Sequence, residues 1–251
     1  RRLRSILAAY RKVLDRAATD PLREELKWLG QEVGGIRDDE VALAHLADLV
    51  AAQPEELVLG PVAARLQQNR IQQGTAGIAR AADTLSDPRY LRLLDDLYGL
   101  LADPPFTGTA GDPARPVVGK AVRRAGRTLR RRVTRARESA GDDGSTALHD
   151  VRKAAKRLRY TGEVAAPELG PPMEALVASA EAIQDLLGER QDTLVTRARC
   201  RQIGIEAAAV GENAWTYGRL HGLEEWRAER VEREFWARWP QLRAELKSAT
   251  P

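Results

Sequence analysis

Hydrophobic residues recur at intervals of three and four along most of the chain, which is the spacing of one face of an α-helix. The strict alternation typical of a half-buried strand is nearly absent. The pattern therefore predicts an all-α protein. We expect helices near residues 1–16, 21–52, 56–84, 88–102, 117–139, 146–166, 172–204 and 212–247.

Proline, glycine and aspartate mark the ends of these segments. Asp20 and Asp87 each stand directly before a proline, the order expected for an N-cap and the first helical residue, and Ser145 is a third expected cap. The longest irregular stretch, "ADPPFTGTAGDPARP", is rich in proline and glycine. We expect a first helical repeat over 1–102, a linker over 103–116 and a second repeat over 117–251.

The two predicted repeats resemble each other in sequence. "RRLR" at the start of the chain aligns with "KRLR" 155 residues later, and Gly34 and Asp38 align with Gly188 and Asp192 at an offset of 154. A single gap in a loop reconciles the offsets, so we expect a tandem repeat of helices. The counterpart of Val117 would precede the chain's first residue. We therefore expect the first repeat to be incomplete at its N-terminus.

Charge is distributed very unevenly along the chain. The net charge is +4, but the segment from Arg115 to Tyr160 carries fifteen basic and four acidic residues, which leaves −7 for the remainder. This asymmetry indicates a polyanionic partner such as DNA, RNA, an acidic membrane face or polyphosphate. The alternative is a solvated face of arginine-rich helices with no partner.

The remaining composition narrows the setting of the protein. The single Cys200 excludes an internal disulfide and fits a reducing cytoplasm. No run of about 18 apolar residues is present to cross a membrane. Tryptophans gather in the last predicted helix, where we expect them to be packing anchors: Trp215, Trp226, Trp236 and Trp239.

The stretch "LHDVRKAAKRLRY", residues 148–160, separates its charges from an apolar stripe. Spacing of three and four predicts a core face made of Leu148, Val151, Ala155, Leu158 and Gly162. Two adjoining stripes hold His149, Arg152, Lys156 and Arg159, and then Lys153, Arg157 and Tyr160. Like charges one turn apart destabilise an isolated helix, so we expect an external anion to compensate them.

Two other predicted helices have the same arrangement. Residues 117–139 carry an apolar stripe made of Val118, Val122, Ala125, Leu129 and Val133, flanked by basic residues. A short connection makes this helix the antiparallel neighbour of residues 146–166. Residues 1–16 place Arg1, Arg4 and Arg11 beside a shorter stripe made of Leu3, Leu7, Tyr10 and Leu14. Two basic faces would then line one groove, and arginine forks suit phosphate oxygens.

These residues carry a resemblance to a known family. "HDVRKAAKRLRY" resembles the first signature of CHAD domains, and "VGGIRDDEV" and "LLGERQDTLV" resemble the second. The resemblance implies two antiparallel four-helix bundles related by pseudo-two-fold symmetry, with a basic central groove that binds inorganic polyphosphate and has no catalytic activity. It also implies association with polyphosphate granules and a CYTH triphosphatase domain that often precedes such domains. No cofactor is implied, and homodimerisation stays open.

The stripes and the resemblance together give the predicted polyphosphate site: Arg1, Arg2, Arg4, Arg11, Lys120, Arg123, Arg124, Arg127, Arg131, His149, Arg152, Lys153, Lys156, Arg157, Arg159 and Tyr160. Tyr160 could equally lie at the edge of the core. Arg37, Asp38 and Asp192 are expected to form ion pairs that orient groove residues. Gly34 and Gly188 are interpreted as close contacts between helices.

Two rival functions use the same residues. His149 and Asp150 could belong to an HD-type metal-dependent phosphohydrolase, but only His45 and His221 remain as further histidine ligands, and the basic stripe would repel a divalent cation. A nucleic-acid-binding bundle is the stronger rival, because a basic groove does not by itself distinguish one phosphate backbone from another. The chain lacks a short helix-turn-helix with polar side chains to read bases.

Overall fold

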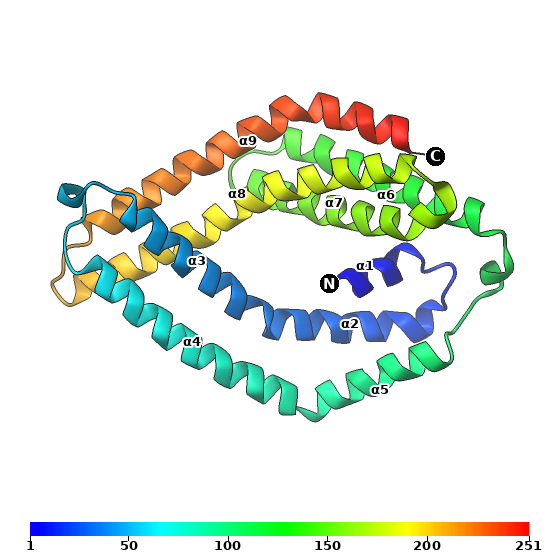
Figure 1. Ribbon diagram of the computed structural model, residues 1–251, viewed down its shortest axis with the longest axis horizontal. Helices are drawn as coiled ribbons and strands as arrows, with labels where there is room; N and C mark the ends of the chain where they lie inside the picture. Colours follow the sequence, from blue (N-terminus) through cyan, green and yellow to red (C-terminus); the bar gives the residue numbers. More distant parts are fainter. Residues whose placement is uncertain (251) are drawn as a thin grey trace. The chain divides into compact units, whose positions relative to one another are not determined.

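The computed structural model describes the backbone of residues 1–250, and all their side chains except those of Ile36, Arg37, Asp38 and Asp142. Within that range the chain is built of α-helices joined by turns (Figure 1), which confirms the all-α prediction. The elements are α1 Arg2–Ala9, α2 Arg16–Glu32, α3 Gly34–Ala51, the 3-10 helix η1 Glu55–Leu57, α4 Val62–Ser86, α5 Pro88–Ala102, the 3-10 helix η2 Gly108–Gly111, α6 Ala114–Glu138, α7 Gly141–Leu169, α8 Pro172–Ala209 and α9 Trp215–Ala249.

Helix α5 begins and ends where the sequence predicts. The amide of Arg89 donates a hydrogen bond of 2.7 Å to Oδ1 of Asp87, and Pro88 is the first helical residue. This confirms the predicted N-cap, since the proline has no amide hydrogen to satisfy at that position. Helices α6 to α9 differ from the predicted ranges only at their ends.

Two other predicted caps are wrong. Helix α2 begins at Arg16, so Asp20 and Pro21 lie inside it. Asp15 is the effective cap, because its Oδ1 accepts a hydrogen bond of 3.0 Å from the amide of Ala17. Ser145 also lies inside its helix, since α7 begins at Gly141, whose φ of 58° only glycine adopts easily.

The predicted helix over 21–52 is two helices, separated at Val33 where two glycines follow. The predicted helix over 1–16 ends at Ala9, because the next residues pair with the linker instead. The amide of Asp15 donates to the carbonyl of Pro105 at 2.8 Å, and that of Thr107 donates to Val13 at 2.9 Å. The segment predicted as 56–84 forms η1 before α4 begins at Val62.

The chain divides into two compact units. Unit 1 contains residues 1–28, 92–188 and 233–251, and unit 2 contains residues 29–91 and 189–232. Each unit draws on both predicted repeats, and α8 and α9 contribute residues to both units. The repeat boundary rests on sequence similarity and stays a prediction. Every residue of the predicted polyphosphate site falls in unit 1.

Unit 1 is organised around α6 and α7, which pack side by side as the sequence predicts. Most of the predicted core stripe of α6 is buried, and so is that of α7. In the stripe predicted for residues 1–16, Leu7 and Tyr10 are buried. The prediction that Leu3 lies in the core is wrong, because its side chain is exposed. The first turns of α8 and the last turns of α9 complete this core with Met173, Leu176, Ile183, Phe235, Trp239 and Leu246.

Unit 2 has its own core between α3, α4, α8 and α9. The buried cluster consists of Leu43, Leu46, Val50, Val62, Leu66, Cys200, Ile203, Ala207, Tyr217 and Leu220. Burial raises the pKa of the Cys200 thiol to about 12. Trp215 and Trp226 lie outside this core with exposed side chains, so their prediction as packing anchors is wrong. Among the described residues, no helix combines the length and apolar character needed to cross a bilayer.

Candidate functional site

Helix α7 presents its charges at the surface because its apolar stripe is fixed in the core of unit 1. Leu148, Val151 and Leu158 are buried. At Gly162 an added Cβ would lie 2.9 Å from a methyl carbon of Leu176, so α8 approaches too closely for any other residue. These contacts set the rotation of α7 about its axis. The two basic stripes therefore remain on adjoining faces beside the core.

The two units differ in net charge. Unit 1 carries 28 basic and 19 acidic residues, a net charge of +9, and unit 2 carries 12 basic and 17 acidic residues, a net charge of −5. The basic surplus predicted for residues 115–160 thus belongs to a unit that is cationic as a whole. Such a surface attracts polyanions over a distance of about a Debye length.

Arg157 is the focus of this charge. Its side chain is exposed, yet the pKa of its guanidinium is lowered, first by partial removal from water and then by other positive charges. Those charges belong to Arg23, Arg132, Arg4 and Arg11. We name these five residues the Arg157 cluster. Within the described residues no acidic side chain pairs with Arg157, so an incoming anion would relieve the repulsion.

The cluster is assembled from four helices and one turn. Arg4 lies on α1, Arg11 in the turn after it, Arg23 on α2, Arg132 on α6 and Arg157 on α7. The hydroxyl of Tyr10 donates a hydrogen bond of 3.0 Å to the carbonyl of Thr161 and thereby ties the α1 segment to α7. Burial raises the pKa of this hydroxyl to about 12, so it remains a donor at physiological pH.

An aspartate holds part of the cluster in place. Asp20 accepts hydrogen bonds from Arg11 at 3.0 Å and from Arg23 at 2.5 Å, and lies 3.6 Å from Arg16. The hydrogen bond from Arg23 and the neighbouring arginine charges lower the pKa of Asp20. One carboxylate thus orients three guanidinium groups while neutralising a single charge.

A second aspartate acts in the same way at Arg132. Asp150 on α7 lies 3.1 Å from Arg132 and 2.6 Å from Lys153. Burial opposes ionisation of Asp150, but Lys153, Arg132 and His149 outweigh it and lower its pKa. Lys153, predicted as a phosphate ligand, therefore shares the single charge of Asp150 with Arg132. Asp150 serves here as a partner of cations.

The C-terminal end of the basic stripe is neutralised more fully. Arg159 lies 2.5 Å from Glu181 and 3.6 Å from Glu163, and Glu163 also lies 2.7 Å from Arg2. The guanidinium carbons of Arg159 and Arg2 stand 4.8 and 6.0 Å from the ring centre of Tyr160. Tyr160 thus supports two cations through its ring. Arg2, Arg159 and Tyr160 form a paired group beside the Arg157 cluster.

Arg152 links the two signature motifs. Its guanidinium lies against Gly188 of α8, where an added Cβ would stand 3.3 Å from Nη2 and 3.4 Å from Nε. Nε of Arg152 is buried and has no hydrogen-bond partner in the described part of the chain. Gly188 was predicted as a close contact between helices. The structure confirms a close contact there, made by the side chain of Arg152 from α7.

Other predicted site residues lie around this region. Arg1 is exposed, and Arg4 and Lys156 are partly exposed. His149 and Arg123 are partly exposed. Four exposed cations of α6 that were predicted as ligands form no ion pair within the described residues: Lys120, Arg124, Arg127 and Arg131.

Sequence reasoning missed Arg23 and Arg132 as site residues. Arg23 follows Asp20 by one helical turn, but the predicted cap at Asp20 placed it outside the basic surface. Arg132 lies between the buried Leu129 and Val133, so it flanks the stripe that faces α7. This position in the sequence could have indicated that Arg132 belongs to the site. The side chains of Arg37 and Asp38 lie outside the described residues.

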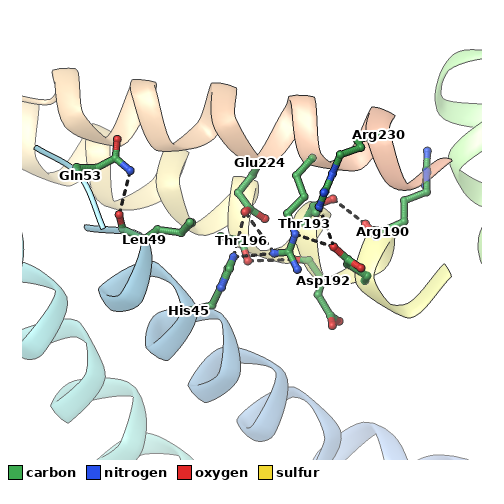
Figure 2. Close-up of polar contacts among 11 residues, drawn as sticks. His45, Leu49, Gln53, Arg190, Asp192, Thr193, Thr196, Glu224 and Arg230 are labelled. Atoms are coloured by element: carbon green, nitrogen blue, oxygen red, sulfur yellow. Dashed lines mark hydrogen bonds and ion pairs between the residues drawn. The ribbon is translucent and has the colours of Figure 1, made fainter. Parts of the chain in front are cut away.

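Unit 2 gathers charged side chains in a different way, shown in Figure 2. Glu224 of α9 has a side chain only 1% exposed, and its Oε1 lies 3.0 Å from Nε2 of His45 and 3.4 Å from Nη1 of Arg227. Arg227 also lies 3.0 Å from Glu189, and Arg190 donates to Glu232 at 2.8 Å. Each of these arginines has an acidic partner. In the described residues no group of three or more histidine, cysteine or acidic side chains is arranged to hold a metal ion.

The fold and this surface define a helical domain with a concentrated patch of arginine. The chain belongs to the CHAD domain family, whose model matches residues 1–201. Two Mycobacterium tuberculosis proteins, MT2285 and Rv2226, both described as uncharacterized, are 32% identical to it over 250 residues, which is 99% of this chain and 47% of theirs. The chain thus spans about half the length of these relatives.

Solved structures share the fold. PptA from Streptomyces chartreusis superposes with a TM-score of 0.76 at 19% identity, covering 96% of this chain and 86% of that one. The CHAD domain from the plant Ricinus communis superposes with a TM-score of 0.67 at 24% identity, covering 98% of this chain and 78% of that one. At these identities the likeness concerns the fold alone.

Proposed function

We propose that this chain binds inorganic polyphosphate on the cationic surface of unit 1 and catalyses no reaction on it. The observation that carries the proposal is the Arg157 cluster, in which five arginines have only Asp20 and Asp150 as acidic partners among the described residues. Partial removal from water and then the other arginines lower the pKa of the exposed Arg157 guanidinium. Maintaining such repulsion costs stability, and a bound polyanion offsets that cost. Arginine forks suit this role because each donates two parallel hydrogen bonds to phosphate oxygens.

A linear ligand suits the surface better than a single phosphate group. Arg152, Lys156 and Arg157 follow one another along α7 at a rise of about 1.5 Å per residue, so they offer successive contacts along the helix. The exposed cations of α6 add further contacts beside them. An extended chain of phosphates would release counterions at each contact, which gives affinity without any sequence to read.

The wider role follows from this binding. Polyphosphate binding would target the protein to polyphosphate granules in the cytoplasm. Since the relatives are about twice as long as this chain, a linked domain such as a triphosphatase would supply any catalysis. In that arrangement the helical domain holds the ligand, and the linked domain acts on it.

Competition binding tests the proposal against its strongest rival, a nucleic-acid-binding function. Fluorescently labelled long-chain polyphosphate is bound to the purified chain at physiological salt. Unlabelled polyphosphate, duplex DNA and single-stranded DNA of equal phosphate content, and tripolyphosphate then compete for it. We expect long-chain polyphosphate to compete at least roughly tenfold better than duplex DNA. Equal competition by duplex DNA would show that the assignment is wrong.

A further inference from the structure

The outer face of α9 in unit 2 exposes two tryptophans with two glycines between them. The side chains of Trp215 and Trp226 are 47% and 57% exposed. At Gly218 and Gly222, an added Cβ would meet nothing within 4 Å. Trp215 and both glycines line a hollow of about 520 Å³, together with Arg219 and Leu223. The helix backbone is thus bare on a face bordered by large aromatic rings.

Exposing this face to water lowers the stability of an isolated domain. Two indoles in water forgo burial of a large apolar area each, and glycine within a helix costs about 1 kcal/mol relative to alanine. The guanidinium carbon of Arg230 stands 5.6 Å from the ring centre of Trp226. A surface that combines exposed aromatic anchors with a bare backbone is typical of a protein interface.

We propose that this face binds the same face of a second copy of the chain, with the two α9 helices antiparallel and a two-fold axis passing at Gly222. In that register, a residue a given number of places before Gly222 faces the residue the same number of places after it on the other copy. Gly218 then faces Trp226, so each indole fits the space above a glycine. Arg219 faces Glu225, which makes two reciprocal ion pairs.

Charge complementarity selects a second copy as the occupant. Arg219 uses its Nε for Gln53 at 2.9 Å, which leaves its other N–H groups for a carboxylate. Glu225 is 51% exposed and accepts from Arg197 through Oε1 at 2.6 Å, which leaves Oε2 for a second donor. The pattern complements itself, as an isologous interface requires. One helix face is small beside a standard interface, so the dimer is weak and depends on concentration.

Sedimentation velocity tests the pairing over a roughly hundredfold range of protein concentration. We expect a reversible monomer–dimer equilibrium for the unaltered chain. Gly222→Leu should abolish it, because its side chain enters open space in the monomer but blocks the helix crossing. Trp226→Ala should weaken the dimer roughly 30-fold or more, as expected for a central aromatic anchor. Circular dichroism checks that both variants remain helical.

A charge exchange tests the register. Arg219→Glu alone and Glu225→Arg alone each place like charges opposite one another, so each variant should be monomeric. Mixed together they should form a heterodimer, because one ion pair keeps its original sign and the other is restored with reversed sign. A chain that stays monomeric at every concentration, or a Gly222→Leu variant that still dimerises, would overturn the proposal. The inference does not depend on polyphosphate binding, since all of these residues lie in unit 2.

Discussion

Arginine side chains have different surroundings in the two units. In unit 2, Arg65 lies 2.7 Å from Glu212, Arg190 lies 2.8 Å from Glu232, and Arg199 pairs with Asp39. In unit 1 a single carboxylate, that of Asp20, is shared by Arg11, Arg16 and Arg23. Arg157 has no acidic partner among the described residues. Matched charges connect helices within a unit, whereas unmatched charges leave a demand for an external anion. The ratio of acids to arginines, more than the number of arginines, therefore distinguishes the proposed binding surface of unit 1 from the paired arginines of unit 2.

The largest expected effect is the loss of polyphosphate binding when charge is reversed on α7 of unit 1. The double variant Arg152→Glu and Lys156→Glu should weaken polyphosphate binding roughly a thousandfold, because each reversal removes an attraction and adds a repulsion. The matched control is Arg70→Glu with Arg80→Glu, two exposed cations of α4 in unit 2. The control changes net charge equally and should retain most of the affinity. If both double variants lose binding equally, net charge alone explains the interaction and the site is wrongly placed.

Removing the buried carboxylate of Glu224 should destabilise unit 2. Glu224→Ala leaves His45 and Arg227 without their shared partner, which should destabilise the unit by about 3 kcal/mol. Cys200 is the single thiol of the chain and is buried in that core, so the rate of thiol labelling reports opening of unit 2. Labelling should become much faster in the variant. Glu229→Ala, at an exposed position of the same helix, should label as slowly as the unaltered chain.

Single arginine removals should change stability with opposite signs in the two units. Arg157→Gln should weaken polyphosphate binding about tenfold, yet raise the melting temperature, because four neighbouring arginines lose a repulsive partner. Arg65→Gln should lower the melting temperature slightly, since Glu212 loses its hydrogen-bond donor, and leave the affinity unchanged. A melting temperature that falls for Arg157→Gln would show that this arginine is stabilised by contacts within the protein.

The effect of pH should be the smallest and should arise in unit 2. Burial opposes ionisation of Glu224, but His45 and Arg227 outweigh it and hold its pKa below the ordinary value of 4.5. The ionised form therefore stabilises the native state above pH 4.5, and this contribution is lost as pH falls through the lower native pKa. Urea denaturation between neutral pH and pH 4 should show a steeper loss for the unaltered chain than for Glu224→Gln. Equal slopes would mean that Glu224 does not titrate differently on folding.

Much of the fold could be predicted, since burial of one face per helix imposes a spacing that is visible in sequence. The stripes of α6 and α7 and the cap at Asp87 depend on residues close together in the chain, and these predictions are confirmed. The cap at Asp20 was wrong because a competing cap, Asp15, begins the helix earlier. The exposure of Trp215 and Trp226 could not be predicted, because residue type alone does not show which helix face meets a neighbour.

The candidate site was predictable on α7 but not across helices. Periodicity indicated which cations of α7 share a face. Arg23 and Arg132 lie near Arg157 because of how three helices pack. The spacing of residues within one helix carries no information about that packing. The same limit applies to Asp20 and Asp150, whose partners lie partly on other segments. Which predicted ligands contact polyphosphate stays a prediction.

The bond between Tyr10 and Thr161 joins segments separated by 151 residues in sequence. A chain that emerges from the ribosome N-terminus first holds Arg4 and Arg11 in solution long before α7 has been made. Such long-range contacts form slowly, because a large loop must close before any contact is gained. During that delay the early arginines have no fixed neighbours and are open to any polyanion nearby. The proposed binding surface thus becomes complete only when α7 has been synthesised.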